Sequence, residues 1–205
     1  MRRTFLFFAA AFALLACDGG SPTGGADAAM DRDEALTAAR AWDAVGVGVM
    51  EGIDGPSIDG SQDGEPRQVT ATAALNRTRA CPVSGTATLR GTRVLAHNPV
   101  TDTRSMHLAA TRTDAACTVN ARRGGGTIRI TTTPDVAVTA HQTWTAGQPG
   151  TRTVTHKGSF GWRRSTGQSG TCAVDLTATF TPVTRTYTLG GAFCGHAVSV
   201  TRTAP

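Results

Sequence analysis

The sequence predicts an all-β protein: an antiparallel meander of about eight or nine strands, forming a barrel or a sandwich, preceded by a short N-terminal helix. Three observations lead to this prediction. From residue 67 onward, apolar and polar residues alternate with a period of two, as in half-buried strands. Threonine, which favours strands, occurs 34 times, and 31 of these residues lie from Thr70 onward. Turn-forming residues separate the alternating segments, with no helical pattern between them.

The N-terminal residues follow the pattern of an export signal. Arg2 and Arg3 precede an apolar stretch that ends at Ala16, too short for the roughly 20 residues of a membrane-spanning helix. The stretch leads into Leu14-Leu15-Ala16-Cys17, which resembles the lipobox of bacterial lipoproteins. The resemblance covers residues 1–17 and implies that residues 1–16 are a removed signal peptide and that Cys17 is lipidated. The alternative is an ordinary signal peptide in which Cys17 is incidental.

This resemblance implies a place in the cell envelope, with the protein anchored to a membrane by the lipid on Cys17 and facing the periplasm or the cell exterior. Residues 17–30, rich in Gly, Ser and Pro, are expected to form a flexible tether. An acidic leader follows at residues 31–66, and a basic, threonine-rich β domain at residues 67–205.

The leader contains a possible helix at residues 31–51. Acidic residues in its first turn suit the helix dipole. One side of this helix would carry Leu36, Ala39, Asp43, Val47 and Met50. The pattern is imperfect, because Asp43 interrupts the apolar stripe and two glycines weaken the second half.

The strands of the β domain are expected at residues 68–77, 82–96, 102–115, 126–133, 136–146, 151–162, 172–181, 184–193 and 196–203. Turn signals such as Asn98-Pro99 and Pro182 separate most of them. A sheet of this kind protects its edges by closing into a barrel or by packing as a sandwich, and both architectures remain open.

Four cysteines remain when Cys17 is set aside: Cys81, Cys117, Cys172 and Cys194. An even number in an oxidising compartment predicts disulfides. If Leu89 pairs with Leu108 and Leu176 with Leu189, each hairpin leaves its two cysteines one residue out of register, an offset that a bulge accommodates. We therefore predict Cys81–Cys117 and Cys172–Cys194 among three possible pairings.

Charge divides the mature chain. Residues 17–66 hold eleven acidic residues and two arginines, a net charge of −9, whereas residues 67–205 hold sixteen basic and four acidic residues, a net charge of +12. Two arginine pairs near glycine-containing loops are candidates for anion binding, because guanidinium groups bind phosphate and carboxylate bidentately. They are Arg122, Arg123, Arg163 and Arg164. The expected partner is a polyanion, either envelope polysaccharide or lipopolysaccharide, and no specific nucleic acid is expected; the alternative is a solvated surface neutralised by the leader.

Metal binding is a less favoured hypothesis. Asp59, Ser61 and Asp63 resemble the opening of an EF-hand-like calcium loop, but Thr70 stands where that loop has glutamate. A solvated acidic linker is the favoured interpretation. Zinc is also left open, because strands could bring together two of the five histidines, which are His97, His107, His141, His156 and His196.

No catalytic constellation emerges, since the β domain has only four acidic residues and no Gly-x-Ser-x-Gly motif. The predicted function is that of an exported, lipid-anchored envelope lipoprotein with a non-enzymatic binding or structural β domain and no cofactor. The alternatives are a barrel-type carrier of a small apolar ligand and, less favoured, a hydrolase of unrecognised type.

Overall fold

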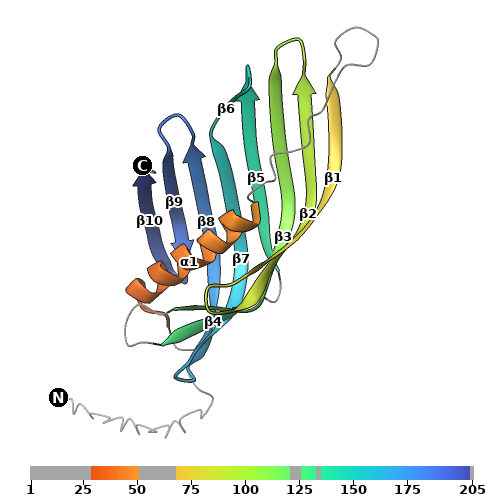
Figure 1. The fold of residues 1–205 in the computed structure, drawn as a ribbon. Helices are drawn as coiled ribbons and strands as arrows, with labels where there is room; N and C mark the ends of the chain where they lie inside the picture. Colours follow the sequence, from red (N-terminus) through yellow and green to blue (C-terminus); the bar gives the residue numbers. More distant parts are fainter. Residues whose placement is uncertain (1–28, 51–67, 121–125, 133–134, 204–205) are drawn as a thin grey trace, which may run out of the picture.

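The computed structural model describes residues 29–50, 68–120, 126–132 and 135–203. One helix precedes ten strands that pair in a single antiparallel sheet, so the predicted all-β meander is confirmed (Figure 1). The helix is α1 (Arg32–Met50). The strands are β1 (Val69–Ala80), β2 (Ser84–Asn98), β3 (Thr103–Asn120), β4 (Thr127–Thr131), β5 (Val136–Thr145), β6 (Gln148–Pro149), β7 (Arg152–Arg164), β8 (Ser169–Thr181), β9 (Thr186–Phe193) and β10 (His196–Thr203).

Strands β4 and β5 share one position in the sheet, between β3 and β7. β4 pairs with residues 117–120 of β3, and β5 pairs with residues 103–112 of the same strand. The strand order is therefore β1-β2-β3, then β4 and β5 in succession, then β7-β8-β9-β10, while the two-residue β6 pairs with β5. β1 and β10 stand at the two ends of this order.

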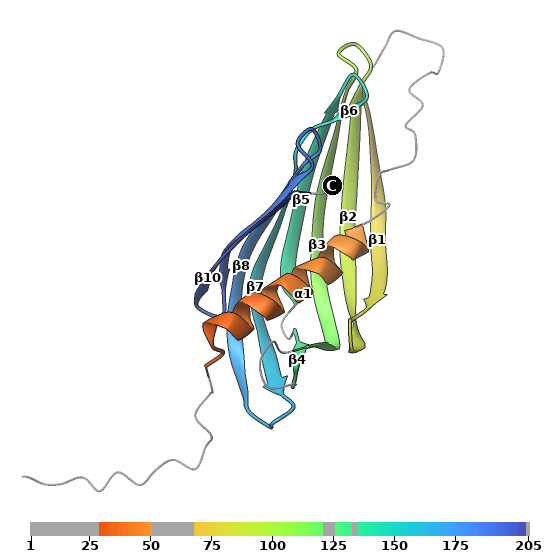
Figure 2. The same cartoon turned by 60° about the vertical axis from the view of Figure 1, so that its left-hand side comes forward.

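The helix α1 crosses one face of the sheet diagonally (Figures 1 and 2). We call this side the helix face and the opposite side the outer face. Alternate residues of each strand point to the two faces. In β5, for example, Val136, Val138 and Ala140 are buried on the helix face, whereas Thr139 and His141 are exposed on the outer face.

Threonine dominates the outer face. Thr153, Thr179, Thr188 and Thr201 stand directly opposite one another on β7, β8, β9 and β10. The branched side chain suits the pleated surface, and its hydroxyl remains accessible to water. This arrangement explains why threonine is so abundant in the β domain.

The helix begins after Asp31, whose carboxylate accepts a hydrogen bond of 2.9 Å from the backbone N–H of Glu34. This is an N-cap, which satisfies a backbone donor at the start of the helix. The buried side of α1 consists of Ala35, Ala38, Ala39, Trp42, Asp43, Val45 and Gly46. The predicted stripe was therefore incomplete: it included Ala39 and Asp43 but missed Trp42, the largest buried side chain of the helix.

Gly46 allows close contact between α1 and the sheet. A Cβ atom at this position would lie 3.1 Å from Nη1 of Arg112 and 3.4 Å from Cε1 of His156. The glycine that weakens the helical pattern in the sequence is thus explained by packing, because a larger residue would push the helix away from the sheet.

Helix and sheet share one hydrophobic core. Met30, assigned to the tether in the sequence analysis, is 3% exposed, and its carbonyl oxygen lies 2.7 Å from Nε2 of His196. Met30 and residues 31–46 of the leader therefore pack as part of the β domain. The boundary predicted at residue 66 separates an acidic segment from a basic segment of the sequence. It does not separate two hydrophobic cores, because α1 and the sheet share one.

The predicted disulfides are both present. The Cα atoms of Cys81 and Cys117 are 5.4 Å apart, and those of Cys172 and Cys194 are 4.5 Å apart. Cys81 follows β1 and is joined to β3, while Cys194 follows β9 and is joined to β8. Each bond therefore ties the turn of an outermost hairpin to the neighbouring third strand.

The hairpin registers behind that prediction were wrong. Leu89 pairs with Arg112 instead of Leu108, and Leu189 pairs with Ala178 instead of Leu176. Four residues connect β2 to β3 and β8 to β9, which shifts the registers by even numbers of residues and leaves the faces unchanged. The Asn98 side chain, which accepts a 3.0 Å hydrogen bond from the Val100 N–H, stabilises the first of these longer turns.

Candidate anion-binding sites

Several predicted site residues lie outside the described part of the chain. They are Cys17, the calcium-loop residues Asp59, Ser61 and Asp63, and the arginines Arg122 and Arg123. The structure does describe the second arginine pair, Arg163 and Arg164, at the end of β7.

Arg163 and Arg164 point to opposite faces of the sheet, because adjacent residues of a strand alternate. Arg164 lies on the helix face, where its guanidinium pairs with the Glu34 carboxylate of α1; its Nε donates a 2.7 Å hydrogen bond to Oε1. This contact raises the pKa of Arg164. Arg164 is thus neutralised by the leader, whereas Arg163 is exposed on the outer face.

Arg163 has a second arginine directly opposite it. Arg129 on β4 pairs in register with Arg163 on β7, and both side chains are exposed on the outer face. Side chains at directly opposite positions have Cβ atoms about 4.5–5.5 Å apart, so two like charges there repel each other. Among the described residues, neither arginine has an acidic partner.

A notch of about 440 Å³ adjoins this arginine pair. Gly161 forms part of its lining, and its lack of a side chain leaves space between Thr131 on β4 and Thr171 on β8. Ser169 and Thr171 line the opposite side. Two guanidinium groups and three hydroxyl groups therefore surround a space large enough for a phosphate, sulfate or carboxylate group.

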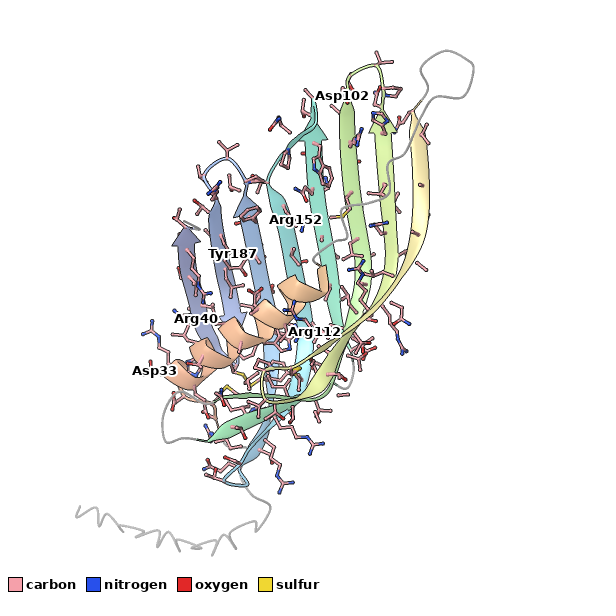
Figure 3. All side chains as sticks on the ribbon, in the orientation of Figure 1. Asp33, Arg40, Asp102, Arg112, Arg152 and Tyr187 are labelled. Atoms are coloured by element: carbon pink, nitrogen blue, oxygen red, sulfur yellow. A yellow bond between two sulfur atoms is a disulfide. The ribbon has the colours of Figure 1, made fainter. Side chains whose placement is uncertain are left out.

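A second pocket, of about 400 Å³, lies where α1 meets β8, β9 and β10. Its wall is apolar, formed in part by Phe180, Leu189 and Val200. Three arginines also line it, Arg40, Arg185 and Arg202. Figure 3 labels Arg40 on α1 and Tyr187 on β9. This combination suits a small molecule with an apolar body and an anionic group.

Asp43 contributes a carboxylate to the α1 pocket. It accepts a hydrogen bond from the Tyr187 hydroxyl, and its other oxygen, Oδ1, has no hydrogen-bond partner among the described residues. Burial raises the pKa of Asp43, although Tyr187 and the charges of Arg112 and Arg202 oppose this effect. Burial also raises the pKa of Tyr187.

A polar cluster lies beneath α1 in the centre of the core (Figure 3 labels Arg112). The Arg112 guanidinium lies 3.8 Å from the centre of the Trp42 ring and donates to Asp114, with Nη2 2.9 Å from Oδ1. Trp42 Nε1 donates a 2.9 Å hydrogen bond to Asp114 Oδ2. Burial, with a further contribution from Arg112, lowers the pKa of His156 to about 3. The cluster is closed to solvent, so its role is structural.

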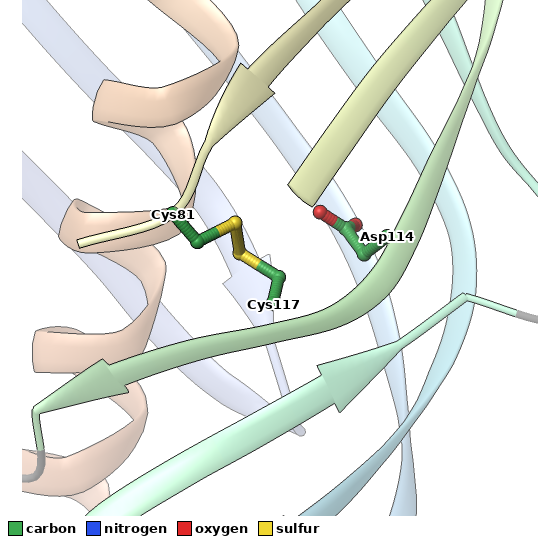
Figure 4. A group of neighbouring side chains, drawn as sticks. All are labelled: Cys81, Asp114 and Cys117. Carbon is green, nitrogen blue, oxygen red and sulfur yellow. A yellow bond between two sulfur atoms is a disulfide. The ribbon is translucent and has the colours of Figure 1, made fainter. Parts of the chain in front are cut away.

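Cys81, Asp114 and Cys117 bring three potential metal-ligating groups together (Figure 4). The two sulfur atoms are bonded to each other, and the Asp114 carboxylate is occupied by Arg112 and Trp42. The group is therefore a cross-link beside a salt bridge and has no free thiolate to offer a metal ion.

Arg129, Arg40 and Arg202 were not among the site residues predicted from the sequence. Arg129 occupies a polar position of the alternating segment 127–131, so its exposure could be predicted from that pattern. The identity of the residue opposite it could not. Only the register of β4 against β7 brings it to Arg163, 34 residues later in the chain. Arg40 and Arg202 meet because α1 packs across the sheet.

None of the described helices is long and apolar enough to cross a membrane. The outer-face arginine pair and the α1 pocket are the two candidate anion-binding sites of the described residues. Comparisons with protein families, with curated proteins and with solved structures find no match.

Proposed function

We propose that this chain is an exported, lipid-anchored envelope protein whose non-enzymatic β domain binds an anionic polymer, either envelope polysaccharide or lipopolysaccharide. The observation that carries the proposal is the register pairing of Arg129 with Arg163 on the outer face. The leader supplies Glu34 to Arg164 on the opposite face, and no acidic side chain of the described residues pairs with Arg129 or Arg163.

Electrostatics favours this role. Two like charges at directly opposite positions destabilise a sheet, and an anion bound between them replaces repulsion with two charge-assisted hydrogen bonds. Hydroxyl groups of Thr131, Ser169 and Thr171 surround the same notch and suit the oxygen-rich surface of a sugar polymer. Binding of this kind weakens as salt shortens the screening length from about 10 Å at 0.1 M to about 3 Å at 1 M.

Binding to heparin and to lipopolysaccharide tests the arginine pair. We expect Arg129→Gln and Arg163→Gln each to weaken binding about tenfold at low salt, because each removes a charge-assisted contact of roughly 1.5 kcal/mol. Arg90→Gln is the matched control: Arg90 is also exposed on the outer face, but it lies on β2, away from the notch.

Equal weakening in all three variants would indicate general attraction to a basic surface and would contradict a site at the pair. Absence of binding by the unmodified chain at low salt would reject the polyanion proposal. The whole chain is required for these measurements, because a fragment that begins at residue 67 lacks Trp42 and the other core residues of α1.

The lipid anchor has its own test. The full chain is expressed in a bacterium and followed by mass and by detergent partition. We expect Cys17→Ser to abolish the added lipid mass and the membrane association, because the thiol is the proposed attachment point. Unchanged processing and partition in this variant would show that the anchor assignment is incorrect; Cys81 and the other three cysteines are engaged in disulfides and do not compete.

The α1 pocket favours a second candidate, a carrier of a small ligand. Trp42, Phe160 and Phe193 fill the centre of the helix face, so the available space lies at the edge of α1. Its arginines favour an anionic group on an otherwise apolar ligand. Titration of the same variants with a fatty acid distinguishes the two functions. The affinity for a fatty acid bound in this pocket should be the same in Arg129→Gln, in Arg163→Gln and in the unmodified chain.

A further inference from the structure

Two histidines meet on the outer face of the sheet. His107 on β3 and His141 on β5 are direct partners in the strand register. Both side chains are exposed, and their ring centres lie 4.4 Å apart with the planes inclined by 48°. The two residues are 34 positions apart in the sequence, so only the sheet brings them together.

The pair lines a groove of about 530 Å³ on the outer face. The other residues that line the groove are uncharged: Thr92, Val94, Leu108, Ala109, Thr139, Ala140, Thr153 and Thr155. Thr153 lies directly opposite His141, and Val94 lies directly opposite His107. No positive charge in this lining would repel a cation.

Adjacent imidazoles are suited to a particular class of metal ion. Neutral imidazole nitrogen is a ligand for Zn²⁺, Cu²⁺ and Ni²⁺, whereas Ca²⁺ and Mg²⁺ prefer oxygen ligands. Two ligands on neighbouring hydrogen-bonded strands also need little reorganisation, because the sheet already holds their backbones in place.

We infer that His107 and His141 form a surface binding site for a divalent transition-metal ion. The expected order of affinity places Cu²⁺ above Ni²⁺ and Zn²⁺. No third His, Cys, Asp or Glu joins the pair within the part of the chain that the structure describes. The remaining coordination positions are therefore open to water or to an external ligand.

Titration of the purified full chain with CuSO₄, followed by calorimetry and by electron paramagnetic resonance, tests the site. We expect one Cu²⁺ ion with two nitrogen ligands from imidazole. His107→Gln and His141→Gln should each weaken binding at least about tenfold, since even the loss of a residue that only supports a ligand commonly costs that much. Lowering the pH to about 5 should also weaken binding, because protons compete for the imidazole nitrogens.

His97→Gln is the matched control, because His97 lies on the helix face near Asp102 and is not part of the pair. This variant should bind Cu²⁺ as the unmodified chain does. Both paired histidines are exposed, so their variants are expected to fold, and far-ultraviolet circular dichroism checks this. Unchanged Cu²⁺ affinity and spectrum in the His107→Gln/His141→Gln double variant would overturn the inference, as would binding that depends on His97 alone.

Discussion

Replacing Asp114 with alanine is expected to lower the free energy of unfolding by about 3–5 kcal/mol. The carboxylate is fully buried and accepts hydrogen bonds from both Arg112 and Trp42. Its removal leaves the Arg112 guanidinium buried without its counter-charge, and it also leaves the indole N–H without an acceptor. Chemical denaturation of the variant and the unmodified chain under identical conditions measures the difference.

Asp135→Ala serves as the control for this experiment. Asp135 lies directly before β5, is exposed, and accepts a hydrogen bond from the Thr113 hydroxyl. We expect a change of no more than about 0.5 kcal/mol, as is usual at the surface. A loss of less than about 1 kcal/mol for Asp114→Ala would contradict the role assigned to the buried pair.

The double variant Arg112→Met/Asp114→Leu separates the charge from the packing. Replacing both members of a buried ion pair by apolar residues is often close to neutral, whereas removing one member is not. The double variant should therefore be more stable than Asp114→Ala. If it is equally unstable, the loss arises from packing beneath α1 and not from an uncompensated charge.

The second large effect is a loss of stability in acid caused by His156. Its pKa falls from 6.5 to about 3 because the imidazole is buried beside Arg112. The unfolded chain therefore binds a proton between pH 6.5 and pH 3 that the folded chain does not. Stability should decrease as the pH falls through this range, by several kcal/mol in total at about 1.4 kcal/mol per pH unit.

The pH dependence of the free energy of unfolding, measured for the unmodified chain and for His156→Leu, tests this expectation. The variant should lose the acid-dependent decrease that the imidazole causes, whatever its stability at pH 7. The raised pKa of Asp43 acts in the opposite direction, because a carboxyl that protonates more readily when folded stabilises the fold as the pH falls. The comparison between variants removes this contribution, which both proteins share.

His107→Gln is the control, because it also removes a histidine, but one whose side chain is exposed. Parallel pH profiles for the unmodified chain and His156→Leu would show that the buried imidazole is not the group responsible.

The class of fold followed from local patterns in the sequence. Alternation of apolar and polar residues is a local property, and it located strands such as β4 and β5 closely because each residue's face depends only on its position in the strand. The disulfide pairing was also predicted, although from incorrect registers, because an even shift preserves the faces and the turns placed the cysteines close together.

Which residues of neighbouring strands lie opposite one another depends on the tertiary structure. The pairing of Arg129 with Arg163, and of His107 with His141, depends on the lengths of the turns. It also depends on the way β4 and β5 share one position in the sheet, and no local pattern encodes either feature. The helix shows the same limit. Its extent was predicted, but the role of Trp42 required the buried Arg112 and Asp114, some 70 residues later in the chain, as partners. A polar residue on a predicted strand can face water or be buried with a partner, and only long-range packing distinguishes the two cases.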